Sequence, residues 1–534
     1  MKKKFIFSIL AVITLLCTSC GNSKKEDDTT PTDETVQGPT STDADVLDAW
    51  FEEQAYVPEI VDASITLPKK LPSLGNSLTW TIEQGSGYLK LSKNVLSAKK
   101  SIAAVGCVHE IKVSVAKTDY SYTYYCTSHV ANNRDLPIID IRTDDGIFPT
   151  NKEDYVDGHI SIIDYKDEKY SIALEGAEMG IRLRGNSTMG APKKPFRIKF
   201  DKKQSLFGLT KAKSWVLLAN YYDKSNIRNY LAYNMANRME HLGFQPSAIF
   251  VEVIFNGSYI GLYLLSEQMQ TGEGRVDIED LVDDEGNPSY FLEQNVRAKD
   301  EAGQVENETY FTMNNGTYVY EYKFPEPVTS EQNEYIKNYF EETENAIKNK
   351  SNYEKYIDVN SFIDYYLVQE LFKNVDVAST SQYYVKYANG KLHMGPVWDF
   401  DICAFVVGYD DQDGTYWSYE NVPLYVRETD RWFRWLFEDS VFLSQVKTRY
   451  TEIRNTVVNQ IMDDYSYITE HLKKAQEANL RVWPMEYKSE ANLWIERYYH
   501  SEYKKLTTVE EHYQYLKDHI VKRVKLLDDT YLRK

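Results

Sequence analysis

The residue pattern changes its period along the chain, and this change limits the fold more than any other feature. Alternating apolar and polar runs of strand length fill most of residues 48–300, with turn residues between them. Helical spacing takes over later, first in residues 359–374 and then from about residue 430 onward. A period of two buries one face of a sheet, and a period of 3.6 buries one face of a helix. The sequence therefore predicts an α+β protein in which a sheet half precedes a helical half.

The first twenty residues have the layout of an export signal. Three lysines precede an apolar run, residues 5–16, which is too short to span a bilayer and is typical of a signal peptide. Small residues follow this run and end at Cys20, a pattern that resembles a bacterial lipobox. We therefore expect a lipoprotein signal peptide in residues 1–19 and a lipid on Cys20, with a plain cleaved secretory signal as the alternative.

The segment after the signal is polar, acidic and rich in Pro and Thr. Such a composition cannot bury a core, so residues 20–47 are expected to form a flexible tether. The protein would then be exported and held by the Cys20 lipid to a bacterial membrane, with the outer membrane expected, in the periplasm or at the cell surface. This anchor is the expected link to the membrane, because no later run approaches the ~18 apolar residues of a spanning helix.

Composition limits the classes of partner and of metal. The formal net charge is −19, whereas nonspecific nucleic-acid binding needs a basic surface that displaces counterions. We therefore expect no nucleic-acid partner. Cys107 and Cys126 lie in one strand-rich region and are either a disulfide or two buried thiols. The cysteine spacing does not resemble that of a zinc site.

Residues 48–130 carry short strand-like runs without a cluster of His, Asp or Glu. The runs 78–82 and 111–115 alternate clearly between apolar and polar residues. Regular short strands with turns between them predict a β-sandwich. These runs also resemble bacterial Ig-like modules, so we expect an Ig-like β-sandwich with a structural role, followed by a large domain in residues 131–534.

Two acidic clusters in the large domain predict a place for a cation. Asp376 follows a helical run, and Asp399 and Asp401 follow a strand-like run. Only a predicted hairpin fills the 23 residues from Asp376 to Asp399, so we expect the clusters to lie close together. Paired carboxylates suit Mg²⁺, which often keeps phosphate as a further ligand. Helix, Asp, hairpin and Asp is also the order of a kinase catalytic loop and its metal-binding aspartate. Solvated loop ends are the alternative interpretation.

Six sequence blocks within about residues 133–410 resemble the CotH family, the atypical kinases similar to spore coat protein H. The blocks occur at residues 182–188, 194–200, 215–220 with 227–229, 256–268, 374–376 and 395–401. The resemblance implies a protein-kinase-like fold with a mixed or antiparallel sheet half, a helix-rich half and a helical tail from about residue 415. It also implies ATP-dependent phosphorylation of Ser or Thr in a surface or exported protein, with Mg²⁺ as the cofactor and Mn²⁺ as an alternative ion.

The resemblance further implies roles for single residues. Asp376 would be the catalytic aspartate, and Asp399 would bind Mg²⁺ with Asp401 beside it. The implied nucleotide-binding residues are Arg184, Asn186, Ser187, Lys199 and Glu267. Within this group, Lys199 would bind phosphate and Glu267 would pair with that cation. Alternatively, Arg184 and Lys199 lie on a solvated strand face, and Glu267 forms a structural ion pair.

One departure from the family pattern supports a second hypothesis about function. The resemblance implies an Asn as a metal ligand five residues after the catalytic aspartate, where this chain has Ser381. A hydroxyl is a weaker ligand than an amide oxygen. A non-catalytic surface-binding or adhesion protein with the same scaffold is therefore the alternative. The 43 tyrosines fit it if they supply contact surface, and otherwise they are core residues.

Overall fold

The computed structural model describes most of the chain beyond the predicted tether. The described residues are 38–58, 61, 64–84, 89–98, 108–127, 136–166, 169–377, 379–407, 422–485, 496 and 498–533. The predicted signal peptide, Cys20 and the tether as far as residue 37 lie outside them, as does Cys107. Cys126 is a buried, free thiol. Among the described helices, none has the length and apolar character needed to cross a membrane.

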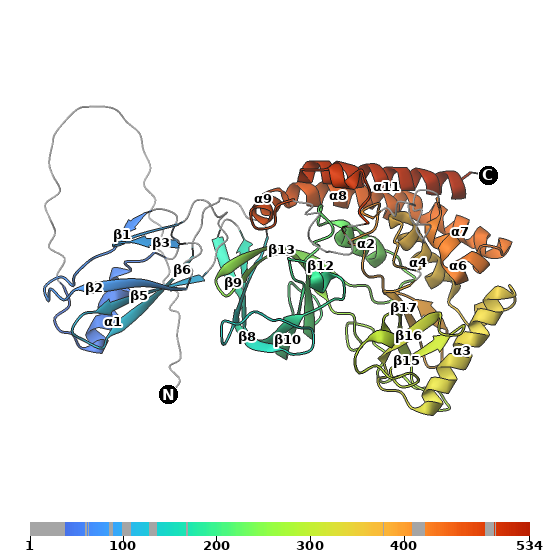
Figure 1. Ribbon diagram of the computed structural model, residues 1–534, viewed down its shortest axis with the longest axis horizontal. Helices are drawn as coiled ribbons and strands as arrows, with labels where there is room; N and C mark the ends of the chain where they lie inside the picture. Colours follow the sequence, from blue (N-terminus) through green and yellow to red (C-terminus); the bar gives the residue numbers. More distant parts are fainter. Residues whose placement is uncertain are drawn as a thin grey trace, which may run out of the picture.

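The N-terminal unit contains two small antiparallel sheets and one helix (Figure 1). The sheets are β1 (Ile65–Thr66), β4 (Val95–Ala98) and β3 (Leu89–Ser92), and β2 (Leu78–Gln84), β5 (Val108–Val115) and β6 (Ser121–Thr127). The helix α1 (Ala44–Gln54) begins four residues before the expected start of this unit. Leu47 and Phe51, one helical turn apart, are fully buried in the core of the unit. The strands agree with the expected sheets, while their Ig-like character stays a prediction.

Seven strands close into a barrel after this unit, in the order β10-β11-β13-β12-β7-β8-β9. They are β7 (Ile138–Thr143), β8 (Val156–Lys166), β9 (Lys169–Leu183), β10 (Phe196–Gln204), β11 (Ala212–Leu218), β12 (Ala248–Phe255) and β13 (Ser258–Glu267). The pair of β12 and β7 is parallel and the others are antiparallel, which confirms the expected mixed sheet. Asn256 and Gly257 have φ values of 47° and 75° in the β12–β13 turn, as a tight two-residue hairpin requires.

A second sheet and most of the helices follow the barrel. The sheet order is β15 (Tyr310–Met313), β16 (Tyr318–Phe324), β14 (Tyr290–Gln294), β17 (Gln382–Lys386) and β18 (Leu392–Met394). Helix α2 (Arg228–Asn237) lies between β11 and β12 of the barrel. The helices described after the barrel are α3 (Ser330–Lys348), α4 (Val359–Phe372), α5 (Tyr425–Thr429), α6 (Arg431–Leu436), α7 (Ser440–Ile453), α8 (Asn459–His471), α9 (Lys473–Val482) and α11 (Val509–Tyr531). The predicted order of a sheet half and a helix-rich half is therefore confirmed.

Tyrosine is mainly a core residue of this protein. Among the described residues, nine of the eleven largest fully buried side chains are tyrosines. Several of them stack in one core that joins the second sheet to the helices, as Phe311 and Tyr320 do at a centroid distance of 5.1 Å. The abundance of tyrosine therefore reports first on packing.

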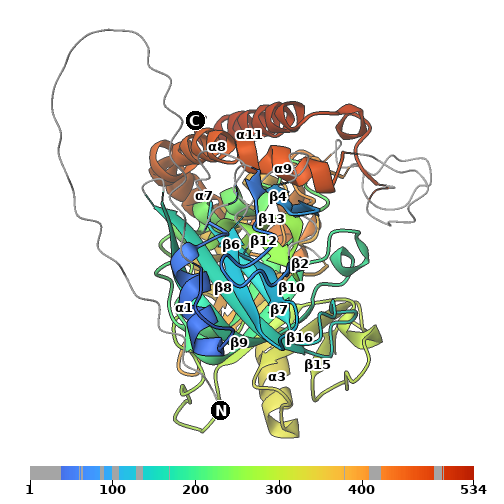
Figure 2. The same cartoon turned by 90° about the vertical axis from the view of Figure 1, so that its left-hand side faces the viewer.

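The C-terminal helices lie along one side of the barrel and the second sheet (Figure 1, Figure 2). Helix α9 contacts β13 through Asn479, whose Oδ1 accepts hydrogen bonds from Leu262 N at 3.0 Å and from Lys193 Nζ at 3.1 Å. Gly261 has a φ of 110°, and a Cβ there would lie 2.6 Å from Asn479 Oδ1. Farther along, a buried Arg523 of α11 donates to Glu370 of α4 at 2.6 Å. The tail is thus joined to both halves.

Replacing Gly261 tests this contact. Gly261→Ala puts a side chain into a positive-φ position and against Asn479, so we expect the free energy of unfolding to fall by about 2–4 kcal/mol. Gly286→Ala is the matched control, because Gly286 has a φ of 85° and no atom within 4 Å of an added Cβ. Chemical denaturation of both variants separates the clash from backbone strain. Equal losses in the two variants would contradict the close packing of α9 on β13.

Candidate active site

A cavity of about 480 Å³ lies between the barrel and the second sheet. Barrel residues around the β9–β10 connection line one side, and residues of β14, β16 and the loops near β17 and β18 line the other. The cavity brings together five of the predicted site residues, which are Arg184, Asn186, Ser187, Asp399 and Asp401. Asp376, Lys199 and Glu267 are not among its lining residues.

Asp399 and Asp401 line the acidic side of the cavity, and Asp376 interacts with both of them although it is not a lining residue. Burial raises the pKa of Asp376 to about 7, with a further increase from the charge of Asp399 and a decrease from Arg297. Burial also raises the pKa of Asp401 well above its usual range, and the charges of Asp399 and Asp376 act in the same direction. Charges that disfavour one another in this way fit a site for a cation. The two predicted acidic clusters therefore do meet in space.

Asn374 links the two acidic loops. Helix α4 ends at Phe372, and Lys373 follows in the left-handed conformation with a φ of 47°. Asn374 then accepts a hydrogen bond from Asp376 N at 3.1 Å and donates to the carbonyl oxygen of Asp399 at 3.2 Å. Asn374 belongs to the sequence block of Asp376, but its role as a link could not be read from the sequence.

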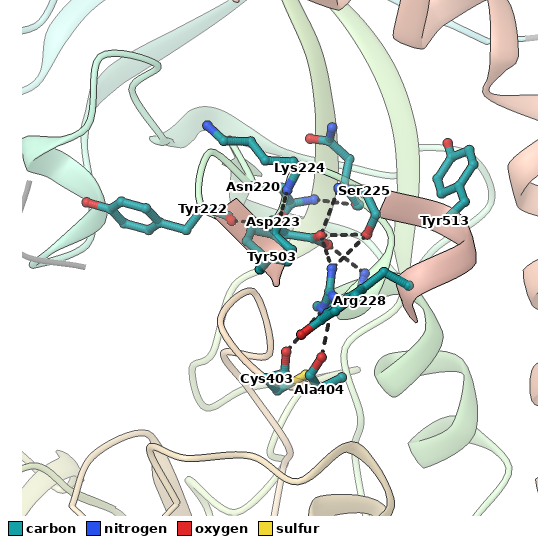
Figure 3. A network of polar contacts seen from close by, with 12 residues as sticks. Asn220, Tyr222, Asp223, Lys224, Ser225, Arg228, Cys403, Ala404, Tyr503 and Tyr513 are labelled. Carbon is teal, nitrogen blue, oxygen red and sulfur yellow. Dashed lines mark hydrogen bonds and ion pairs between the residues drawn. The ribbon is translucent and has the colours of Figure 1, made fainter. Parts of the chain in front are cut away.

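The start of helix α2 holds the loop that carries Asp399 and Asp401. Asn229 Oδ1 accepts a hydrogen bond from Phe400 N at 2.7 Å. Its neighbour Arg228 donates from Nε to the carbonyl oxygen of Cys403 at 3.1 Å (Figure 3). Arg228 also forms an ion pair of 2.5 Å with Asp223, and both side chains are fully buried. Through these contacts, residues 227–229 hold the loop that carries Asp399 and Asp401 in position.

Ser381 contacts the expected metal-binding aspartate directly. Its Oγ donates to Asp399 Oδ2 at 3.2 Å. Both residues have positive φ values, 56° for Ser381 and 66° for Asp399. Such conformations cost free energy in residues with side chains and persist where the surrounding structure fixes them. The hydroxyl of Ser381 thus stands where the resemblance implies an amide, and it orients the carboxylate of Asp399.

The opposite side of the cavity is basic. Arg182, Arg184 and Arg197 all line it. Burial lowers the pKa of Arg197, and the charges of Arg182 and Arg184 lower it further. Within the described residues, the buried Nε atoms of Arg182 and Arg197 have no hydrogen-bond partner. An anion such as a phosphate group would reduce the repulsion between these arginines and accept hydrogen bonds from their unpaired N–H groups.

Lys199 and Glu267 are placed differently from the expectation. Lys199 is exposed, and its Nζ lies 5.9 Å from the ring centroid of Tyr155. Glu267 instead pairs with Arg275 and accepts a hydrogen bond from Ser247 N at 2.9 Å. Glu267 therefore forms a structural ion pair in this structure. The alternation of β10 placed Arg197 and Lys199 on one face, but it could not show which of them reaches the cavity.

The acidic residues fit a hard cation by their chemistry. Asp399 and Asp401 offer carboxylate oxygens, the ligands that Mg²⁺ and Mn²⁺ prefer. In the described part of the chain, no group of three or more His, Cys, Asp or Glu side chains has the geometry of a complete metal site. Mg²⁺ usually keeps water and phosphate oxygens as ligands beside one or two carboxylates, so a partial protein site agrees with it.

The sequence matches one known family over more than half of its length. The family profile described as CotH kinase protein matches residues 181–527. This range contains the whole cavity lining except Lys152. A search of curated proteins finds no match.

Removing the Asn229 side chain tests whether α2 positions the acidic loop. In Asn229→Ala the buried Phe400 N–H loses its acceptor, so we expect the free energy of unfolding to fall by about 1–3 kcal/mol. Calorimetric titration with Mg²⁺ and ATP should show weaker binding. Asn237→Ala, at the other end of α2, is the control that changes a helix-end contact outside the cavity. Unchanged Mg²⁺ and ATP affinity in Asn229→Ala would contradict the positioning role.

Proposed function

Because the chain belongs to the CotH kinase protein family, we propose that it is an exported kinase that transfers phosphate from ATP to Ser or Thr of surface or exported proteins. The single observation that supports this proposal best is the cavity with a basic and an acidic side. Phosphoryl transfer requires mainly positioning and charge neutralisation, and the two sides supply both.

The acidic side supplies the group that acts on the acceptor hydroxyl. Asp376 would accept a hydrogen bond from the Ser or Thr hydroxyl and take its proton during transfer. A pKa of about 7 suits this role, because a general base works best when its pKa lies near the working pH. Asn374 fixes the backbone of Asp376 relative to Asp399.

The remaining cavity residues would bind the nucleotide. Asp399 and Asp401 would hold Mg²⁺, which neutralises phosphate charge when it is bound. Arg184 and Arg197 would contact the phosphates from the barrel side, with Asn186 and Ser187 in the same loop as further contacts. Arg184 lies with its guanidinium carbon 5.4 Å from the ring centroid of Trp398, which orients it toward the acidic loop.

The proposal places this activity outside the cytoplasm. The apolar run and Cys20 of the sequence support export and a lipid anchor to a bacterial membrane, with the acceptor protein at the cell surface or in the periplasm. The net charge of −19 supports a protein acceptor over a nucleic acid.

A non-catalytic role in surface binding or adhesion is the second candidate, because of one specific observation. Ser381 occupies the position of the implied metal-ligand Asn and donates to Asp399 Oδ2 at 3.2 Å. A hydroxyl that is already bonded to the carboxylate adds little to the binding of a cation. A scaffold that binds a partner without turnover would tolerate this residue.

Asp376→Asn tests the proposed kinase. We expect phosphate transfer to a degenerate peptide library with a central Ser or Thr to fall at least about 100-fold, because the amide cannot take the proton. The exposed Asp300→Asn is the control and should transfer as the wild type does. Wild-type transfer by Asp376→Asn would contradict the role of Asp376, and a wild-type chain that does not bind nucleotide would overturn the proposal.

The same variant has an expected effect on stability. The pKa of Asp376 of about 7 lies above that of an unfolded aspartate, so the folded chain binds the proton more tightly. As the pH rises from the pKa of the unfolded aspartate to the pKa of Asp376 in the folded chain, ionisation therefore lowers the free energy of unfolding. Asp376→Asn should raise the free energy of unfolding at pH 8 by about 2 kcal/mol and leave it almost unchanged at pH 4. Denaturation at both pH values, without Mg²⁺, measures this difference.

Ser381→Asn distinguishes the two candidate functions. If the cavity is a kinase site, the amide oxygen adds a metal ligand, and Mg²⁺-dependent ATP affinity should rise about tenfold. Ser379→Asn in the same loop is the control, because Ser379 donates to the carbonyl oxygen of Asp376 and lies outside the cavity lining. Unchanged affinity in Ser381→Asn would favour the non-catalytic function.

A further inference from the structure

We infer that Arg297 is a further catalytic residue, whose guanidinium contacts the phosphoryl group in transfer from the side of the second sheet. This inference rests on the proposed kinase function. It adds a cation that the sequence analysis did not select, on the side of the cavity opposite the three barrel arginines. Four observations support it: the position of Arg297, its attachment to the catalytic loop, its electrostatic effect and the engagement of the neighbouring cations.

Arg297 is joined to the catalytic loop through its own backbone segment. Strand β14 ends at Gln294, and the next residues turn into the cavity. Val296 N donates to the carbonyl oxygen of Ser379 at 3.1 Å, which ties this turn to the loop after Asp376. Arg297 N then donates to Asn295 Oδ1 at 3.1 Å. These bonds set the direction in which the Arg297 side chain leaves the backbone.

The charge of Arg297 acts on the proposed catalytic base. Arg297 lines the cavity together with Asp399, and its positive charge lowers the pKa of Asp376 against the effect of burial. The hydrogen bond from Val296 N to the carbonyl oxygen of Ser379 places Arg297 beside the loop that follows Asp376, and therefore close to the hydroxyl that Asp376 would orient. The transferring phosphoryl group has to approach the same hydroxyl, so it comes within reach of the guanidinium.

Two neighbouring lysines are engaged elsewhere, one on the second sheet and one in the β7–β8 connection of the barrel. Lys323 lies between Glu293 and Glu321, at 2.9 Å and 2.7 Å. Lys152, in the barrel connection, contacts Glu301 at 3.5 Å and Asn186 Oδ1 at 3.0 Å. Within the described part of the chain, Arg297 forms no ion pair of this kind. Its five N–H donors are therefore available to an incoming anion.

The chemistry of the step gives Arg297 a defined task. The acceptor oxygen forms a bond to the γ-phosphorus, and the bond from this phosphorus to the bridging oxygen breaks with its electron pair on ADP. Asp376 takes the hydroxyl proton. Negative charge is spread over the three non-bridging oxygens during transfer, and the guanidinium stabilises it by hydrogen bonds without giving up a proton. An arginine placed here acts on the transition state more than on bound ATP.

The test compares Arg297→Ala with Lys299→Gln, an exposed cation on the same segment. We expect Arg297→Ala to lower kcat for transfer to the degenerate Ser/Thr peptide library about 100-fold or more, with KM for ATP changed less than about threefold. The variant should also fail to form the complex in which tetrafluoroaluminate joins bound ADP and Mg²⁺ as an analogue of the transition state. Its affinity for ADP and Mg²⁺ alone should stay that of the wild type. Low millimolar guanidinium should restore part of the lost rate, which a merely structural residue would not allow. Lys299→Gln should behave as the wild type.

The outcomes separate this inference from the proposed function. An unchanged kcat in Arg297→Ala, or a loss that appears only in KM, overturns the role of Arg297 and leaves the kinase proposal standing. A lower melting temperature without rescue by guanidinium also overturns it, since the effect is then on the fold. A wild-type chain that binds neither ADP nor tetrafluoroaluminate overturns the kinase proposal, and this inference with it.

Discussion

The buried ion pair between Asp223 and Arg228 is the contact on which the arrangement of the cavity depends. Two charges without solvent are costly to bury unless they are paired and their other donors and acceptors are satisfied. Asp223 also accepts from Ser225, and Arg228 donates to the carbonyl oxygens of Cys403 and Ala404. The buried pair is therefore stable only when the segment around residues 223–228 packs against the loop at residues 403–404. The acidic loop is held in place by this requirement.

The cavity itself is a region that opposes folding. The charge of Asp399 raises the pKa of both Asp376 and Asp401, the arginines repel one another, and Ser381 and Asp399 hold left-handed backbone conformations. The apolar and tyrosine-rich core beneath the second sheet provides the free energy that offsets these terms. The proposed nucleotide and its Mg²⁺ would supply the opposite charges and so stabilise the folded chain when they bind.

The sequence was sufficient for local structure and for the main acidic residues. Residue periodicity located α4, because the spacing of apolar residues depends on neighbours within one element. The hairpin between Asp376 and Asp399 also made their approach predictable. Long-range pairing could not be predicted in this way. Closure of the barrel depends on β12 meeting β7, more than a hundred residues earlier, and the partner of Glu267 depends on how the chain returns through Arg275.

The contacts of the C-terminal helices affect when the cavity can form during synthesis of the chain. Asn479 of α9 completes the hydrogen bonds of Leu262 and Lys193, and Arg523 of α11 satisfies Glu370 in the helix that leads to Asp376. A ribosome makes both of these residues after every residue of the cavity. The nascent protein therefore lacks these contacts until α9 and α11 have left the ribosome, so the cavity can reach its final form only after nearly the whole chain has been made.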